Sequence, residues 1–387
     1  MLRPLLFSIL LSLPPAALAG TTLGADRDAL REHYGERAVI ARGEALDLLA
    51  PLVARCPGDD RIDRTTCVDI HLRYGGLLIE EAAYRWEGEL AAWQERHDAW
   101  PDGAAGPEPQ PDHGVSRGLR QQAITALRAA LTLDPEHPRA SEARFDIGQT
   151  LLLLEHPDAA LTWLRLLVDL DPEGPLTPDA LLTIGEVWMD RDAPHKALPA
   201  LRRASALESP LRPWILTRLA WARAGVGDVS GAIDAVTEAL QDTPDAAFAP
   251  EARAALVHYL GETSDPERAR GLIEQLSPKE DSGRLLSALA DRWTDQGRGD
   301  LTLDLLGGLL SSRPSDRSAP HWQARLVRLH THADRFEAAS QAAAQLLATY
   351  GPGSDHAQSD EDVVDLCERT QRELAVALHR AALLGAR

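Results

Sequence analysis

Residues 141–172 read SEARFDIGQTLLLLEHPDAALTWLRLLVDLDP. Apolar side chains recur in this stretch at helical spacing, and the helix formers Ala, Leu, Arg and Glu are frequent along the whole chain. The pattern of helix, short turn, helix runs from Asp26 onward, and few stretches alternate with the period of two that is typical of a strand. The sequence therefore predicts an all-α fold. The turns are marked by Asp134-Pro135, Asp171-Pro172, Gly227-Asp228, Thr243-Pro244 and Pro314.

The same stretch opens a repeat. Three dipeptides, each a large residue followed by a small one, have their second members 37 and 35 residues apart. An alanine follows each of them by twelve residues, and a proline or Ser-Pro pair stands twelve residues beyond the alanine. A shared period with shared internal offsets is the signature of a repeat array. The positions are Ile147-Gly148, Ile184-Gly185 and Leu219-Ala220, then Ala160, Ala197 and Ala232, then Pro172, Ser209-Pro210 and Pro244.

These units resemble the tetratricopeptide repeat. In residues 141–172, Leu151 takes the aromatic slot of that repeat, Ala160 the small slot of the second helix and Leu164 the bulky slot. Small residues at those slots let two helices approach closely where they cross. The resemblance implies a right-handed α-solenoid of about five to six helix hairpins, in which stacking neighbours form one continuous core. Residues 213–244 fit nearly as well, the units near Pro178, Pro250, Gly283 and Pro320 are looser, Thr302 replaces the second-helix alanine of one unit, and His330 fills the aromatic slot of the last.

A narrower resemblance covers residues 144–154, 178–204 and 218–233. RFDIGQTLLLL, PDALLTIGEVWMDRDAPHKALPALRRA and RLAWARAGVGDVSGAI are similar to large envelope proteins of deltaproteobacteria. That group includes tetratricopeptide proteins associated with gliding-motility machinery. The resemblance implies a role in an envelope assembly, with other envelope proteins as partners.

The first residues predict export. Arg3 precedes an apolar run over residues 5–13, and Ala17-Leu18-Ala19 supplies small residues before Gly20. This three-part pattern is typical of a secretory signal peptide over residues 1–19, and the run is too short to span a bilayer. We expect a periplasmic protein, with a peripheral association with the outer membrane left open, and no membrane span in the mature chain.

Residues 20–100 form a separate helical module. Helical pattern covers residues 26–54, with a break near Gly43, and a longer helix covers residues 66–97. Cys56 and Cys67 enclose the turn between them and are expected to form a disulfide in an oxidising compartment, although a free or metal-bound pair is an alternative. Cys367 stands alone and is expected to be a small core residue. A stripe of Leu72, Ile79, Trp86 and Trp93, seven residues apart, is expected to pack on a neighbouring helix.

The remaining boundaries follow from composition. Residues 101–114 hold four prolines and three glycines, which predicts a linker loop. The repeat array is expected over residues 115–358, with residues 117–133 pairing with the preceding long helix. Residues 359–387 are expected to form a C-terminal capping helix, and Ser359 with Asp362 resembles a capping box.

Charge and motifs exclude several functions. Asp plus Glu total 59 against 40 Lys plus Arg, so the net charge of −19 disfavours nucleic acid as a partner. Only Lys196 and Lys279 are lysines.

Ser116 lies in a GxSxG string, but the proline-rich segment before it lacks the strand that a nucleophile elbow needs. His330 and His332 are two residues apart and point in different directions on a helix. We therefore predict no catalytic residue, no metal site, no cofactor and no enzymatic activity, with a hydrolase using an acidic dyad such as Glu186 and Asp291 as a remote alternative.

The resemblance implies a binding groove lined by the first helix of each hairpin. The groove would combine acidic pairs, Glu186/Asp190 and Asp291/Asp295, whose repulsion a cationic partner would relieve, with apolar groups on a surface that solvent reaches. The alternative is that the acids form a solvated face and the tryptophans are core. The last unit turns basic, with His321, Arg328 and His332. The sequence thus predicts a scaffold for basic or apolar segments of partner proteins, and a glycan or peptidoglycan receptor stacking sugars on tryptophans is the alternative. The predicted groove residues are Phe145, Gln149, Glu186, Met189, Asp190, Trp214, Trp221, His258, Asp291 and Asp295.

Overall fold

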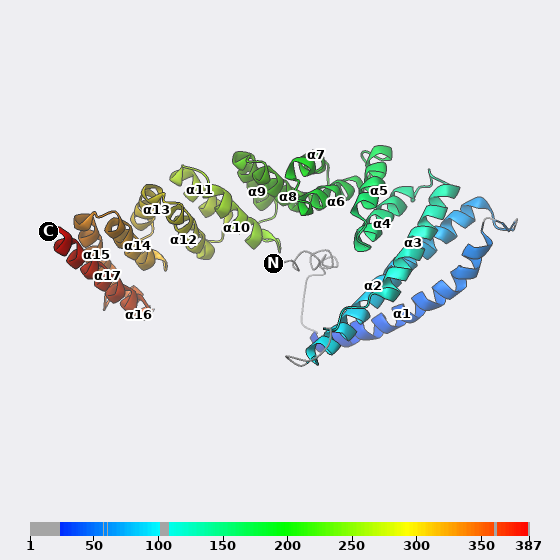
Figure 1. Ribbon diagram of the computed structural model, residues 1–387, viewed down its shortest axis with the longest axis horizontal. Coiled ribbons are helices and arrows are strands. Elements are labelled where there is room, and N and C mark those ends of the chain that lie inside the picture. The colour runs from blue at the N-terminus through cyan, green and yellow to red at the C-terminus, as the bar shows by residue number, and fades with distance from the viewer. Residues whose placement is uncertain (1–23, 57, 60, 101–107, 360–361, 386–387) are drawn as a thin grey trace. The chain divides into compact units, whose positions relative to one another are not determined.

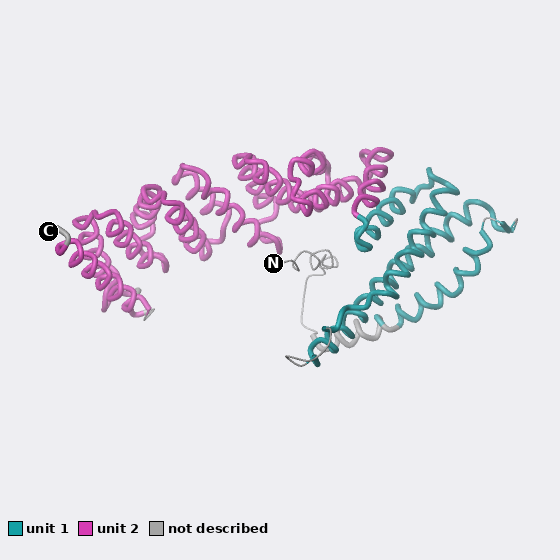
Figure 2. Tube along the Cα trace, in the orientation of Figure 1, with its two compact units in different colours: residues 1–156 teal, residues 157–387 magenta. Residues whose placement is uncertain are grey.

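The computed structural model describes residues 24–56, 58–59, 61–100, 108–359 and 362–385. The predicted signal peptide, most of the predicted linker and residues 360–361 inside the predicted capping box lie outside these residues. The described part of the chain contains helices and no strand, so the all-α prediction is confirmed (Figure 1). The chain divides into two compact units, residues 1–156 and residues 157–387 (Figure 2). None of the described helices has the length and apolar character needed to cross a bilayer.

Unit 1 is built on two long helices, α1 (Gly24–Arg55) and α2 (Arg64–Asp98), followed by α3 (Gly114–Leu133) and α4 (Ala140–Leu153). A disulfide between Cys56 and Cys67 joins the end of α1 to the start of α2, with 5.7 Å between the Cα atoms. Since a turn of only eight residues separates the two helices, the bond restricts how far their ends can part.

The predicted break near Gly43 is wrong, because α1 runs through both Gly43 and Pro51. Just before the glycine, Arg42 Nε lies 2.8 Å from Glu81 Oε2 on α2, and the Arg42 guanidinium lies 5.3 Å from the Tyr84 ring centre. A glycine inside a helix costs about 1 kcal/mol relative to alanine. Anchoring of α1 on α2 offsets that local preference.

Helix α2 packs along α3, as the sequence predicted for residues 117–133. A Cβ atom on Gly75 would stand 2.7 Å from the side chain of Leu127, so the two helices approach more closely than any larger residue allows. Leu72 is buried in this contact region, whereas the other residues of the predicted stripe, Ile79, Trp86 and Trp93, are half-buried. There Trp93 Nε1 donates to the carbonyl oxygen of Pro109 at 2.8 Å, and Trp86 stacks on His113. The segment after residue 107, rather than a helix, covers these two tryptophans.

Unit 2 is a row of helix hairpins (Figure 1). Within each hairpin the two helices pack on each other, and the second helix packs on the first helix of the next hairpin, as between α7 and α8. The helices are α5 (Pro157–Leu170), α6 (Thr177–Asp190), α7 (Pro194–Ser205), α8 (Arg212–Gly225), α9 (Val229–Asp242), α10 (Ala249–Leu260), α11 (Pro266–Leu276), α12 (Lys279–Asp295), α13 (Gly299–Ser312), α14 (Ala319–His332), α15 (Phe336–Tyr350), α16 (Asp355–Ser359) and α17 (Asp362–Gly385).

The repeat positions predicted from spacing are the helix crossings. Ala197, Ala220 and Ala232 are fully buried, and a Cβ atom on Gly185 would stand 2.6 Å from the side chain of Leu201. Thr302 also fills the small slot of its hairpin without exposure, and its hydroxyl lies 3.2 Å from the Thr294 hydroxyl and 3.4 Å from the Ala290 carbonyl oxygen. Thr302 stands where the repeat pattern has an alanine, but its hydroxyl finds hydrogen-bond partners within the hairpin.

The last hairpin is covered by α17. Leu374 on α17 packs in a cluster with Val327 of α14 and with Ala339, Ala342 and Ala343 of α15. Cys367, on the same helix, is buried, as the sequence predicted, and burial raises the pKa of its thiol.

Candidate protein-binding surface

Two neighbouring first helices bring together most of the predicted groove residues of unit 2. On α6, Glu186, Met189 and Asp190 are spaced so that they share one face. On α8, Trp214 and Trp221 are seven residues apart and share a face for the same reason. Helices α6 and α8 contact each other, and Asp190 is exposed while the other four side chains are half-buried.

Arg218 is the centre of this surface. Its guanidinium carbon lies 4.1 Å from the ring centre of Trp214 and 4.4 Å from that of Trp221, so one cation touches both rings. The Arg218 Nε donates to Glu186 Oε1 at 3.3 Å. Arg218 is 6 % exposed, and a partly desolvated cation over an aromatic ring contributes about 1–2 kcal/mol.

Arg218 is not among the groove residues predicted from the sequence, although a signal was present. The residue stands four positions after Trp214 and three before Trp221, which places it between the two rings on a helix. The groove residues were predicted from fixed slots of the repeat, and Arg218 lies outside those slots. An arginine flanked by two tryptophans at helical spacing would have been the cue.

Glu186 has an unusual environment for a surface carboxylate. Burial raises its pKa, and the neighbouring Asp190 acts in the same direction. Arg218 and a hydrogen bond from Trp214 oppose the rise. The carboxylate is therefore held between a cation and an indole N–H.

The second acidic pair is also partly neutralised. Arg325 of α14 forms an ion pair with Asp291 of α12. Similarly, Arg292 of α12 pairs with Glu262, directly after α10, at 2.7 Å. Acids of one hairpin thus pair with arginines of the following hairpin. Asp295 on α12 and His258 on α10 are both exposed.

Two predicted residues lie in the other unit. Phe145 and Gln149 are on α4 of unit 1, where both are half-buried. The residues of the α6–α8 surface all belong to unit 2.

Ser116 of the GxSxG string has a structural role. Its side chain is fully buried at the start of α3, and its hydroxyl donates to Glu89 Oε2 at 2.6 Å. The other oxygen of Glu89 accepts the backbone N–H groups of Val115 and Ser116 at 3.1 and 3.0 Å. Glu89 of α2 therefore caps α3, and an acid at a helix N-terminus is favoured by the helix dipole.

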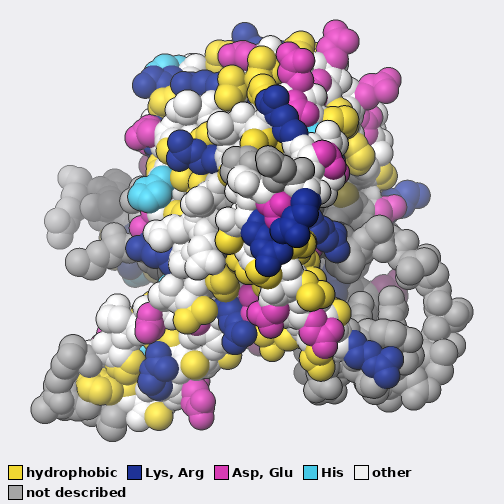
Figure 3. All heavy atoms as spheres, turned by 90° about the vertical axis from the view of Figure 1, so that its right-hand side faces the viewer, with side chains coloured by type: hydrophobic (Ala, Val, Ile, Leu, Met, Phe, Trp, Pro, Cys, Tyr) yellow, Lys and Arg dark blue, Asp and Glu magenta, His cyan; other side chains and the backbone are white. Residues whose placement is uncertain are grey.

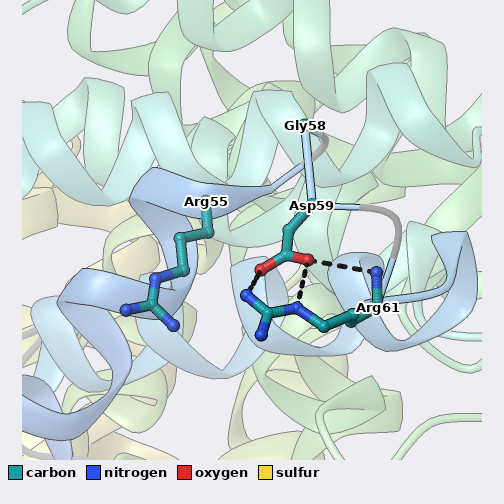
Figure 4. A pocket seen from close by; sticks show the side chains of 4 residues that line it. All are labelled: Arg55, Gly58, Asp59 and Arg61. Carbon is teal, nitrogen blue, oxygen red and sulfur yellow. Dashed lines mark hydrogen bonds and ion pairs between the residues drawn. The ribbon is translucent and has the colours of Figure 1, made fainter.

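A pocket of about 610 Å³ lies in the turn between α1 and α2 (Figure 4). Asp59 there accepts from the Arg61 side chain at 2.9 Å and from the Arg61 backbone N–H at 3.1 Å. This pair, with Arg61 exposed and Asp59 half-buried, satisfies itself and holds the turn, so it offers little to a ligand. The face in Figure 3 likewise shows acidic and basic side chains interspersed with apolar ones.

No family model matches the chain, and no curated protein matches it. Solved structures of tetratricopeptide proteins do match. One is the C-terminal part of a repeat-containing protein from Cytophaga hutchinsonii, at 12% identity over 84% of this chain and 94% of that one, with a TM-score of 0.41. Another is a tetratricopeptide protein from Parabacteroides merdae, at 13% identity over 66% and 94%, with a TM-score of 0.36. A third is YrrB, described as having an unusual peptide-binding site, at 14% identity over 51% and 97%, with a TM-score of 0.36. The likeness is one of helical-repeat architecture.

Proposed function

We propose that this protein is a non-catalytic scaffold of the tetratricopeptide type that binds segments of other proteins on the α6–α8 surface. The observation that carries the proposal is the pair of half-buried tryptophans on either side of Arg218, next to half-buried Met189. Aromatic residues, methionine and arginine are the residue types enriched where proteins bind each other. A surface of this kind on adjacent rigid helices favours an extended or helical protein segment.

The charge of the surface selects the segment. Glu186 pairs with Arg218, and Asp190 adds an exposed carboxylate to the same surface. On that basis we propose that the bound segment carries basic residues among its apolar side chains. Association with such a segment would depend on salt, since exposed charges are screened over about 8 Å at physiological ionic strength.

We further propose that the protein acts in the bacterial envelope after export. The support is the signal-peptide pattern of residues 1–19 and the Cys56–Cys67 disulfide, because such bonds persist in oxidising compartments. Intact-mass measurement of the protein purified from its native cells tests this. A chain that begins at Gly20 and, when denatured, is alkylated at Cys56 and Cys67 only after reduction, with Cys367 alkylated before it, supports export. Retention of residues 1–19, or free thiols at Cys56 and Cys67, argues against it.

Site-specific crosslinking tests the binding surface. A photoreactive amino acid at Met189 should capture a discrete partner in native cells, whereas the same group at Leu170, 58 % exposed on α5, should not. Adding Trp221→Ala should reduce the Met189 adduct while helicity by circular dichroism stays unchanged. Equal adducts at Met189 and Leu170, or an adduct indifferent to Trp221→Ala, would overturn the proposed surface.

The glycan alternative is less well supported by these rings. Sugar stacking needs an accessible aromatic face, and Arg218 covers one face of both Trp214 and Trp221.

A further inference from the structure

Arginine side chains gather at the C-terminal end of unit 2. Two depressions lie there, one of about 480 Å³ between α12 and α14 and one of about 1030 Å³ between α14, the start of α15 and α17. Arg284, Arg317 and Arg325 line the first, Arg369, Arg372 and Arg380 line the second, and Arg328 lines both.

These seven arginines face four carboxylates, namely Asp291 and Asp362 in the first depression and Asp334 and Glu373 in the second. The two depressions together therefore carry a charge of about +3 when histidines are neutral, in a chain whose net charge is −19. An excess of cationic side chains in the lining of a depression attracts anionic groups.

Several of the arginines are weakly neutralised. Arg372 lies 3.8 Å from Glu368 one turn away, and both are well exposed, so the pair contributes little. Within the described residues, no carboxylate lies within ion-pair distance of Arg328, Arg369 or Arg380. Burial lowers the pKa of Arg325, and the positive charge of Arg328 lowers it further.

The larger depression also has an apolar floor. Val327 of α14 and Leu374 of α17 are buried beneath it, and Phe336 and Val376 stand at its edge. Val376 is 48 % exposed, which leaves apolar area available to an occupant. Arginine heads around an apolar floor match a ligand with carboxylates and apolar side chains on one face.

We propose that the groove between α14 and α17, with Arg328, Arg369 and Arg380 at its rim, binds an acidic, apolar segment of a partner protein. The segment's carboxylates pair with the guanidinium groups, and its apolar side chains cover Val327, Leu374 and Val376. This site goes beyond the α6–α8 surface, because it takes the opposite charge class at the other end of unit 2. A nucleic acid fits less well, since its extended phosphate backbone would meet the acidic surface on either side.

Fluorescence anisotropy with the full chain tests the inference. The probe is a short fluorescein-labelled peptide of Glu and Leu in helical amphipathic order, and the control peptide carries Lys in place of Glu. The Glu peptide should bind, the Lys peptide should not, and Arg328→Glu with Arg369→Glu should weaken binding by at least roughly tenfold. Both substituted side chains are exposed, so folding should be unaffected. Arg202→Glu on α7, also exposed, is the matched control and should bind like the wild type.

The two sites fail independently. Trp221→Ala should leave binding of the Glu peptide unchanged, so loss of one site does not imply loss of the other. Equal affinity for the Glu and Lys peptides, or equal weakening by Arg202→Glu, would overturn the inference. Tighter binding of an oligouridylate, or concentration-dependent self-association abolished by the Arg328 and Arg369 substitutions, would assign the groove to another occupant.

Discussion

At the residue scale, arginine side chains connect the hairpins. Arg253 is 8 % exposed, and its Nε donates to the Leu276 carbonyl oxygen at 2.8 Å while an Nη donates to that of Pro244 at 2.6 Å. Arg144 donates in the same way to the carbonyl oxygen of Pro135, and both arginines are nine residues after the proline whose carbonyl they reach. The planar fork of a guanidinium can satisfy two separate carbonyls, and an ammonium on a flexible stem cannot reproduce this geometry. This accounts for an arginine rather than a lysine at these positions.

Replacing Arg253 with Lys should lower the free energy of unfolding by about 1–3 kcal/mol, because at least one buried carbonyl loses its partner. Urea denaturation followed by circular dichroism measures the change. Arg202→Lys, at an exposed position on α7, should be neutral. Equal effects of the two substitutions would show that the fork geometry is unimportant.

Asp146 on α4 should make stability depend on pH. Burial, with a contribution from Glu142, raises its pKa from 3.8 to about 6. Because its pKa is higher in the folded state than in the unfolded chain, the stability that protonated Asp146 contributes is fully present below pH 4. That stability is lost as the pH rises through 6. Asp146→Asn should therefore stabilise the protein at pH 7.5 by about 1–2 kcal/mol, after discounting for its partial exposure, and change little at pH 4. Thermal melts at both pH values, with Asp304→Asn on α13 as an exposed control, test this. A benefit of the same size at both pH values would contradict it.

At the element scale, close helix crossings hold each hairpin together. Gly185 lies against Leu201, which is fully buried and has no space to move. Alanine is the better helix former, by about 1 kcal/mol, but only where a Cβ atom fits. The same residue type therefore has opposite consequences at different positions.

Gly185→Ala should destabilise unit 2 by about 1–3 kcal/mol, because overpacking outweighs the gain in helix propensity. Gly307→Ala on α13, where nothing lies within 4 Å of the added Cβ atom, should instead be neutral or stabilising. Differential scanning calorimetry of both variants measures the two signs. Stabilisation by both would mean that the crossing at Gly185 can relax.

At the scale of the whole molecule, each hairpin of unit 2 buries its apolar face only against its neighbours, so the terminal hairpin needs a cover. Helix α17 supplies it through Leu374, which packs with the cluster of Val327 and the alanines of α15. The same helix provides one wall of the basic groove. Stability and the proposed second site are therefore linked at this end.

Ending the chain at residue 358 should expose the cluster and locally destabilise α14 and α15. Hydrogen exchange should speed up by about tenfold or more in those helices, which corresponds to a loss of at least about 1.4 kcal/mol, and remain unchanged in α6–α9. Uniformly faster exchange throughout unit 2 would show one cooperative block in place of a nearest-neighbour array.

The sequence by itself determined the helices, their hairpins and the crossings at Gly185, Ala197 and Ala232, because helix period and small-residue spacing are local properties. Only the tertiary structure showed that α1 continues through Gly43, since an ion pair with α2 lies outside any local window. It also revealed that the partner of Arg218 is Glu186 on another helix, and that the arginines of α12, α14 and α17 gather around shared depressions. Contacts between residues some thirty or more positions apart depend on how hairpins stack, and that stacking is decided by packing of the whole array.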